Sequence, residues 1–189
     1  VLGEFEDYDY VVAPSGSCAG MIKTHYPDLF AGDADAARAA ALCAKTYELC
    51  DFLVSVLKIE NLPGKFDGQI TYHDSCSGLR ELGIRSEPRQ LLASVEGVSL
   101  REMTDAEVCC GFGGTFCVKY PGISDKMLEK KIRHIEATGA DTLIAGDLGC
   151  LMNMAGKLQR EGSAVQVRHV AEVLAGLGDL PAIGEPEAR

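Results

Sequence analysis

Short apolar runs alternate with longer amphipathic stretches along the chain, a pattern typical of strands that alternate with helices. Strands are predicted where apolar side chains cluster over a few residues, at 10–13, 69–73, 98–103, 142–145 and 165–168. Helices are predicted where apolar residues recur at helical spacing, at 33–58, 88–94, 151–160 and 170–177. A further helix is expected between Ser124, as its N-cap, and Gly139, at its C-terminal glycine position. This order predicts an α/β fold with a mostly parallel sheet and flanking helices.

A shorter repeat suggests how the chain is organised. Residues 9–13 are followed by four residues and Cys18, and residues 141–145 are followed by four residues and Cys150. We therefore expect duplicated cysteine-rich units: an incomplete first unit over 1–60, a complete second unit over 61–178, and a loose tail over 179–189. Because the counterparts of the remaining cysteines would fall before Val1, we expect the chain to be a fragment that lacks part of its first unit.

Composition narrows the function classes. The 189 residues carry a formal charge of −10, which argues against nucleic acid as a partner because phosphate binding favours a basic surface. No apolar run approaches the roughly 18 residues that a membrane helix needs. A chain of this length can also bury a core without disulfides, so its eight cysteines are expected to be reduced. These features predict a soluble, cytoplasmic protein with no membrane span.

Four of the cysteines suggest a metal centre. Cys109 and Cys110 are adjacent. Between Cys76 and this pair lie 32 residues, and between the pair and Cys150 lie 39 residues. Cys76 and Cys150 closely follow predicted strands, and the Cys109-Cys110 pair follows another strand at a greater distance. In open α/β sheets, binding sites gather beyond the carboxyl ends of the strands. Soft thiolates suit iron, so the set is most simply interpreted as an iron–sulfur site. A structural zinc site and a set of buried thiols stay open, although paired Cys-x-x-Cys spacings, typical of zinc, are absent.

Longer motifs around these cysteines resemble a known family. The segments are Tyr72-His73-Asp74-Ser75-Cys76, 108–116 (VCCGFGGTF), 147–153 (DLGCLMN) and 14–21 (PSGSCAGM). They resemble the CCG cysteine-rich domain family, in particular the small iron–sulfur subunit of the bacterial L-lactate utilisation system, which is similar to the glycolate oxidase iron–sulfur subunit. The family also includes a subunit of heterodisulfide reductase. Its members carry two such domains in tandem.

The resemblance implies an electron-transfer subunit of a complex that oxidises a 2-hydroxy acid, L-lactate or glycolate. It implies a [4Fe–4S] cluster on Cys76, Cys109, Cys110 and Cys150, with Cys18 left from the first cluster. After purification in air such a site can hold zinc or be empty. The implied partners are a ferredoxin-like iron–sulfur subunit and a third protein. Catalysis by this chain alone is not implied.

The chain departs from the family at one position of the motif, which ends in Cys-x-x-Cys. Asn153 stands three residues after Cys150, and Met21 three residues after Cys18. The departure favours a four-cysteine cluster over a five-cysteine, non-cubane one. Asn153 could hydrogen-bond a sulfur or be an ordinary helix residue.

The other candidate residues allow more than one interpretation. Cys43 and Cys50, about 10.5 Å apart along the predicted helix 33–58, are too distant for a disulfide and are expected in the core. Cys117 is expected to pack rather than bind metal. His73 and Asp74 precede Cys76 at a strand end, where the His73 imidazole could donate to a cluster sulfur; in the other interpretation the two residues form a strand-end turn with a satisfied histidine.

Two other function classes stay open. In a thiol/disulfide-type reductase related to heterodisulfide reductase, Cys109 and Cys110 would exchange disulfides, and a low thiol pKa would mark them. In a structural scaffold domain, the same cysteines would hold zinc instead of iron.

Overall fold

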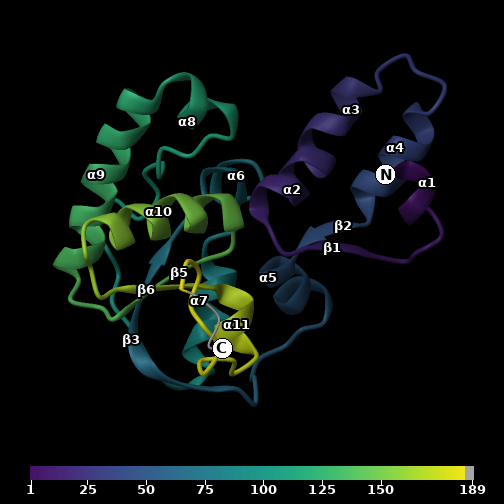
Figure 1. Ribbon diagram of the computed structural model, residues 1–189. Coiled ribbons are helices and arrows are strands. Elements are labelled where there is room, and N and C mark those ends of the chain that lie inside the picture. The colour runs from purple at the N-terminus through teal and green to yellow at the C-terminus, as the bar shows by residue number, and fades with distance from the viewer. Residues whose placement is uncertain (186–189) are drawn as a thin grey trace.

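The computed structural model describes residues 1–185 and contains two parallel sheets (Figure 1). The smaller sheet pairs β1 (Val11–Ala13) with β2 (Thr46–Glu48). The larger sheet has the strand order β4-β3-β5-β6. Its strands, paired in parallel throughout, are β3 (Lys65–His73), β4 (Glu96–Leu100), β5 (Thr142–Ala145) and β6 (Gln166–His169). The predicted α/β fold with a mostly parallel sheet and flanking helices is confirmed.

Helices connect the strands. Those before β3 are α1 (Leu2–Phe5), α2 (Gly16–Gly20), α3 (Tyr26–Leu29), α4 (Ala36–Ala44) and α5 (Leu49–Asp51), with two π-helical turns, η1 (Met21–His25) and η2 (Phe52–Val56). Those after β3 are α6 (Cys76–Arg80), α7 (Ser86–Ala93), α8 (Thr115–Lys119), α9 (Pro121–Ala137), α10 (Leu148–Arg160) and α11 (Val170–Leu174). No helix in residues 1–185 is both long and apolar enough to cross a bilayer.

Two hydrophobic cores cover the two faces of the larger sheet. Successive side chains of a strand point to opposite faces, so Leu143 enters one core and Ile144 the other. The first core is built with apolar residues of α9 and α10, and the second with those of α7 and α11. The cysteines Cys110 and Cys150 belong to the first core. The candidate site therefore lies on the α9 and α10 side of the sheet.

The predicted helix over 33–58 is wrong. Its Ala-rich first part forms α4, but Thr46–Glu48 leaves the helix and pairs with β1 as strand β2. The Thr46 hydroxyl donates to the Leu42 carbonyl at 2.8 Å, and Lys45 O accepts from Val11 N. A strand of three residues is too short to show an alternating pattern, so the helical periodicity around it dominated the prediction.

Other boundaries shift for local reasons. Helix α9 begins at Pro121, a residue suited to a first helical turn, so Ser124 lies inside the helix and is not its N-cap. Gly139 has φ +66° just after the helix, as predicted for a C-terminal glycine. Helix α10 begins at Leu148, three residues before the predicted start, because Asp147 caps it. Strand β4 ends at Leu100 instead of residue 103.

The tail expected to be loose from residue 179 is packed over its described part. Ala182 is buried, and Ile183 packs against the first core while its N–H donates to Val167 O at 2.8 Å. The Arg168 guanidinium also donates to the carbonyls of Gly178 and Leu180. Residues 186–189 of this predicted tail lie outside the described residues.

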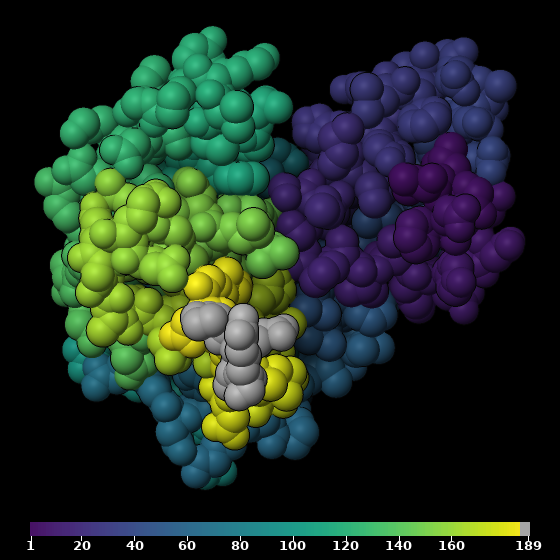
Figure 2. All heavy atoms as spheres, viewed as in Figure 1, coloured from purple at the N-terminus to yellow at the C-terminus, as the bar shows by residue number. Residues whose placement is uncertain are grey.

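The segment from α1 to β2 forms a lobe beside the larger sheet, and this lobe includes the purple spheres of Figure 2, whereas Cys50 of α5 belongs to the second core. One carboxylate joins the lobe to the rest: Asp147 Oδ2 accepts from Ser15 Oγ at 3.0 Å and from Ser17 N at 2.9 Å. Gly16 and Gly78 meet so closely that a Cβ on Gly16 would lie 2.9 Å from Gly78 Cα. Only glycine permits this approach between α2 and α6.

The order of elements in the lobe resembles that in the second half of the larger sheet. β1, α2 and β2 follow one another as β5, α10 and β6 do, and the third helical residue is Cys18 in α2 and Cys150 in α10. In the parallel registers Ala13 pairs with Glu48, and Ala145 pairs with His169. A duplicated unit would produce this correspondence. The duplication and the predicted boundary near residue 60 stay predictions.

A buried acid lies where the lobe meets the larger sheet. Glu48 is 4% exposed and caps α5, accepting from Cys50 N at 2.7 Å and from Asp51 N at 3.2 Å. Burial raises the pKa of Glu48 to about 7, although these hydrogen bonds favour its charged form. The acid also lies against Gly146, where an added Cβ would be 3.4 Å from Glu48 Oε1.

The raised pKa of Glu48 predicts that the stability of the fold depends on pH. The unfolded chain ionises Glu48 near pH 4.5 and the folded chain near pH 7, so stability falls as pH rises across that window. The loss is at most about 3 kcal/mol, since one pKa unit corresponds to about 1.4 kcal/mol. We expect Glu48→Gln, which keeps an acceptor for both N–H groups, to raise Tm at pH 8 and to flatten the change in Tm between pH 5 and pH 8. The exposed Glu60→Gln is the control and should show the wild-type change of Tm with pH. The same change of Tm between pH 5 and pH 8 in wild type and Glu48→Gln would contradict this prediction.

Candidate metal centre

The carboxyl ends of neighbouring strands bring the candidate cysteines to one edge of the larger sheet. Cys76 follows β3 as the first residue of α6, and Cys150 follows β5 in the first turn of α10. The loop after β4 carries Cys109 and Cys110. Since β3 pairs in parallel with both β4 and β5, the three connections leave the sheet on the same side.

The four thiols form a contiguous row. The Cys109 thiol lies near enough to that of Cys76 to shift the pKa of Cys76, and the Cys110 thiol is affected in the same way by Cys109 and Cys150. Of the four sulfur atoms, those of Cys110 and Cys150 form a compact group with a ring nitrogen of His73, within 4.8 Å of one another. The Cys109 contact and burial raise the pKa of Cys76. For Cys110 the Cys109 contact lowers the pKa, but the Cys150 contact and burial outweigh it and raise the pKa to about 12. Metal binding must displace these protons, so affinity falls at low pH.

The Cys109-Cys110 loop is fixed by its glycine and by α9. Gly111 has φ +84°, and a Cβ there would lie 2.6 Å from the Ser124 carbonyl oxygen. The Ser124 hydroxyl donates to Gly111 O at 2.7 Å, and Gly111 N donates to Cys109 Sγ at 3.3 Å. A glycine at this position lets the backbone pass close to α9 while its N–H donates a hydrogen bond to the Cys109 sulfur.

Helix α10 holds the other end of the row. The Asp147 side chain accepts from Cys150 N at 3.5 Å and so starts the helix just before Cys150. One turn later the Asn153 amide donates to Cys110 O at 3.1 Å. Asn153 is a residue of α10 whose amide supports the backbone of a candidate ligand, and among the described residues no hydrogen bond joins it to a sulfur.

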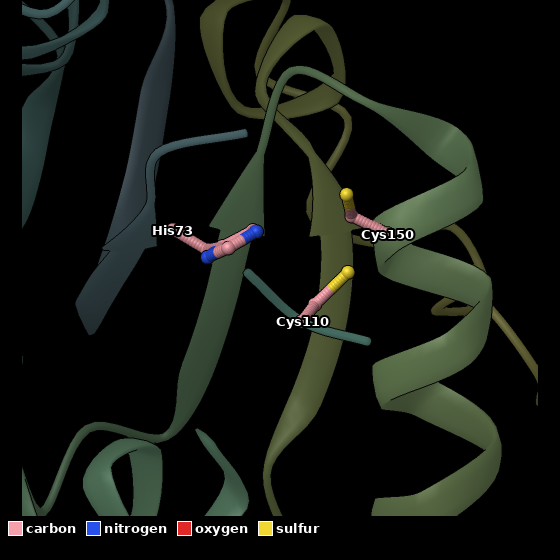
Figure 3. Close-up of side chains that lie close together, drawn as sticks. All are labelled: His73, Cys110 and Cys150. Atoms are coloured by element: carbon pink, nitrogen blue, oxygen red, sulfur yellow. The ribbon is translucent and has the colours of Figure 1, made fainter. Parts of the chain in front are cut away.

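His73 faces the thiols from the end of β3. Its ligand nitrogen and the sulfur atoms of Cys110 and Cys150 all lie within 4.8 Å of one another (Figure 3). The ring is fully buried, and His73 Nδ1 lies 3.1 Å from Ala106 O. Burial, with a contribution from Lys131, lowers the pKa of His73 to about 3, so the ring is neutral at pH 7. This compact group offers nitrogen and sulfur donors to a metal.

A buried cation lies behind the site. Lys131 of α9 is 2% exposed, and its ammonium donates to the carbonyls of Asp105 and Ala106. Burial lowers the pKa of Lys131, whereas Cys110 raises it, which places the ammonium within electrostatic range of the thiol row. A cation here would stabilise negatively charged sulfur ligands.

Asp74, beside His73, has a structural role. Its carboxylate accepts two hydrogen bonds from the Arg89 guanidinium, at 2.8 and 2.9 Å, and Arg89 also pairs with Glu102. The Asp74 side chain is almost fully buried, so this two-point ion pair compensates the buried charge. The ion pair fixes the turn between β3 and α6 and hence the position of Cys76.

The remaining cysteines lie outside the thiol row. All eight cysteines are free thiols. Cys43 and Cys50 are buried, as expected, but on α4 and α5 and not on one helix. Cys117 donates to Gly114 O at 3.1 Å. Cys18 is exposed on α2 and lines a pocket of about 620 Å³ between the lobe and α10, together with Pro14, Ser15, Ser17, Phe112, Asp147, Leu148, Gly149 and His169.

Sequence reasoning missed two contributors to the site, Lys131 and Ser124 as a loop anchor, and it left the direction of the His73 ring open. Lys131 did leave a signal, because it lies three residues after Leu128 and one before Ile132, on the apolar face of the predicted helix. A charged residue in such a position is buried at a cost and therefore has a partner. The direction of the ring depends on strand register, which the sequence alone does not define.

Comparisons with known proteins agree with this architecture. The family model described as "CCG: Cysteine-rich domain" matches residues 70–155, from β3 into α10. The chain is 50% identical over 175 residues to lactate utilization protein A of Lysinibacillus sphaericus (strain C3-41), covering 92% of this chain and 76% of that protein. It is 52% identical to lactate utilization protein A of Geobacillus sp. (strain WCH70), covering 92% and 73%. It is 49% identical to lactate utilization protein A 2 of Bacillus cereus (strain Q1), covering 93% and 73%. The chain therefore belongs to the lactate utilization protein A family.

Proposed function

We propose that the chain is an iron–sulfur electron-transfer subunit that acts in the oxidation of a 2-hydroxy acid, L-lactate in the first place. Cys76, Cys109, Cys110 and Cys150 hold a [4Fe–4S] cluster. The observation that carries the proposal is the convergence of these four thiols from three separate connections at one sheet edge. The names of the relatives, lactate utilization protein A, supply the metabolic context.

The surroundings of the thiols suit such a cluster. A bound iron–sulfur cluster supplies a redox centre whose potential depends on net charge, hydrogen bonds to sulfur and solvent exposure. Cys110 and Cys150 lie in the hydrophobic core, where water is excluded. The buried ammonium of Lys131 offsets negative charge on the sulfurs, and Gly111 N donates to Cys109 Sγ. Both features favour thiolates over thiols and stabilise a reduced cluster.

A thiol-exchange reductase is less well supported. Reactive cysteines have depressed pKa values in electropositive, partly exposed surroundings. Here the pKa values of Cys76 and Cys110 are raised, and Cys110 is only 1% exposed. A thiol kept protonated and inaccessible is a poor nucleophile.

One observation favours a second candidate, a single metal ion such as Zn²⁺. The donor atoms of His73, Cys110 and Cys150 are close enough to bind one ion together. Zinc binds such nitrogen and sulfur donors tetrahedrally, and Cys76 or Cys109 would complete the set. The chain would then be a structural subunit, and its metal would not accept electrons.

The proposed partners follow from the same role. An electron-transfer subunit needs a donor and an acceptor, and the proposal assigns these to a ferredoxin-like iron–sulfur subunit and a third protein, in the cytoplasm. Cys18, exposed at the pocket beside α10, belongs in this proposal to a first cluster. Glycolate stays an alternative substrate of the complex.

The cluster is tested by anaerobic reconstitution with iron and sulfide. We expect about four irons per chain and an EPR signal after reduction. Cys110→Ser and Cys109→Ser should lose most of the iron, because a hydroxyl is a poor ligand for a soft metal site. Cys43→Ser and Cys117→Ser should retain it.

The controls are matched to the variants. Cys117 lies in α8, just after the loop that carries the pair, and a serine there keeps the hydrogen bond to Gly114 O. Cys43 is buried but far along the chain, and it bonds Ile22 O. Equal iron loss in Cys43→Ser or Cys117→Ser would refute the ligand assignment. One zinc ion per chain in protein from cells, with no iron uptake on reconstitution, would favour the single-ion candidate.

Growth on L-lactate tests the metabolic role. In cells that carry Cys110→Ser in their own copy of the protein, we expect growth on L-lactate as sole carbon source to fail while growth on glucose is normal. Cells with Cys117→Ser should grow on both, because that thiol is outside the row. Normal growth of Cys110→Ser cells on L-lactate would rule out the proposed function.

Asn153 should affect how long the cluster persists. Asn153→Ala removes the donor to Cys110 O, a loss of about 1 kcal/mol, so we expect cluster release under a chelator to be roughly five times faster. Iron content just after reconstitution should not change. Gln159→Ala is the control, because that amide lies on the same helix but donates to Gly184 O. Identical release rates for all three proteins would show that this hydrogen bond does not support the site.

A further inference from the structure

The cysteine set leaves one donor of the site without a role, the imidazole of His73. His73 is the last residue of β3, and its ring is completely buried. Because side chains alternate along a strand, Tyr72 enters the core of α7 and α11 while His73 points to the opposite face. Figure 3 shows the ring directed toward the sulfur atoms of Cys110 and Cys150.

The hydrogen bond of His73 determines its tautomer. The Ala106 carbonyl oxygen lies 3.1 Å from His73 Nδ1, 3.2 Å from Asp74 N and 3.3 Å from Lys131 Nζ. A carbonyl oxygen only accepts, so Nδ1 carries the proton and donates it. In a neutral ring the other nitrogen, Nε2, then holds a lone pair.

This lone pair has an unusual environment. Nε2 is inaccessible to solvent and has no hydrogen-bond partner among the residues that the structure describes. A buried acceptor without a donor costs free energy, and such exceptions occur where a ligand or ion completes the group. The finding also corrects one expectation: with its proton on Nδ1, His73 cannot donate to a cluster sulfur.

We propose that His73 Nε2 is a ligand of the metal group and takes the place of one of the four thiolates, so that the centre has mixed cysteine and histidine ligation. The inference rests on the proposed function for the identity of the metal, iron. A ring nitrogen of His73 lies within 4.8 Å of the sulfur atoms of Cys110 and Cys150, and Nε2 is the ring nitrogen that has no hydrogen-bond partner among the described residues. Donation of Nδ1–H to a carbonyl is the usual support for a metal-bound histidine, because it fixes the ring and raises its basicity.

Ligation by a neutral imidazole changes the charge of the centre. A thiolate brings one negative charge to the metal, whereas an imidazole brings none, and histidine ligation raises the potential of iron–sulfur centres. The buried Lys131 acts in the same direction. The centre would therefore accept an electron more readily than one with four thiolates and no buried cation beside it.

The test is direct detection of a metal–nitrogen bond. The chain is labelled with ¹⁵N-histidine, reconstituted anaerobically and reduced, and the nitrogen coupling is measured by pulsed EPR. The sequence contains only four histidines. We expect a strongly coupled histidine nitrogen in the wild type, its loss in His73→Gln, and its retention in His134→Gln. His134 is a matched control because its Nδ1 also bonds a carbonyl, Thr104 O, at 2.8 Å.

Each outcome decides the proposal. A fully loaded cluster without strong histidine coupling, or with coupling that persists in His73→Gln, overturns it and leaves the proposed function intact. If His73→Gln does not fold, a wild type without strong histidine coupling overturns the proposal, and coupling that persists in separate Gln variants of His25, His134 and His169 assigns the nitrogen to His73.

If the wild type takes up no cluster, the proposed function fails by itself, and ligation is then tested with Co²⁺. His73→Gln should bind Co²⁺ roughly tenfold more weakly and with a changed visible spectrum. Unchanged affinity and spectrum would overturn the proposal.

Discussion

Parallel pairing of β3 with both β4 and β5 is the constraint on which the site depends. Each strand runs the same way, so each following connection leaves at the same edge, and cysteines far apart in the sequence meet there. An antiparallel neighbour would deliver its cysteine to the opposite edge. Two apolar cores cover the faces of the sheet, and Cys110 and Cys150 are themselves part of the first core. The strand order therefore brings these donors to one edge of the sheet.

The carbonyl oxygen of Ala106 organises the polar side of the site. It accepts from the end of β3 through His73 and Asp74 N, and from α9 through Lys131. Strand, loop and helix are thus tied at one atom. The same contact sets the tautomer of His73 and locates the buried cation. One backbone carbonyl therefore determines that the lone pair of His73 is on Nε2, and it also holds the Lys131 ammonium behind the thiols.

The sequence was sufficient to predict the alternation of strands and helices and the strand 142–145, where every residue is buried and turn residues flank the run. It was insufficient for β2, because a three-residue strand depends on pairing with β1 across the chain. The cysteine set could be proposed from spacing, since strand ends share an edge. The face of the sheet to which His73 points could not be predicted, because a change of one residue in the strand register reverses it. Lys131 was predictable in principle, as a charge on an apolar helix face.

Asp147 has a consequence for motion. One of its carboxylate oxygens accepts from Cys150 N, and the other accepts from Ser15 and Ser17 of the first lobe. A shift of the lobe would have to break these bonds or pull on the start of the helix that carries Cys150. The carboxylate is therefore a spacer of fixed length between α2 and α10. Cys18 on α2 and Cys150 on α10 therefore cannot change their separation without breaking these hydrogen bonds.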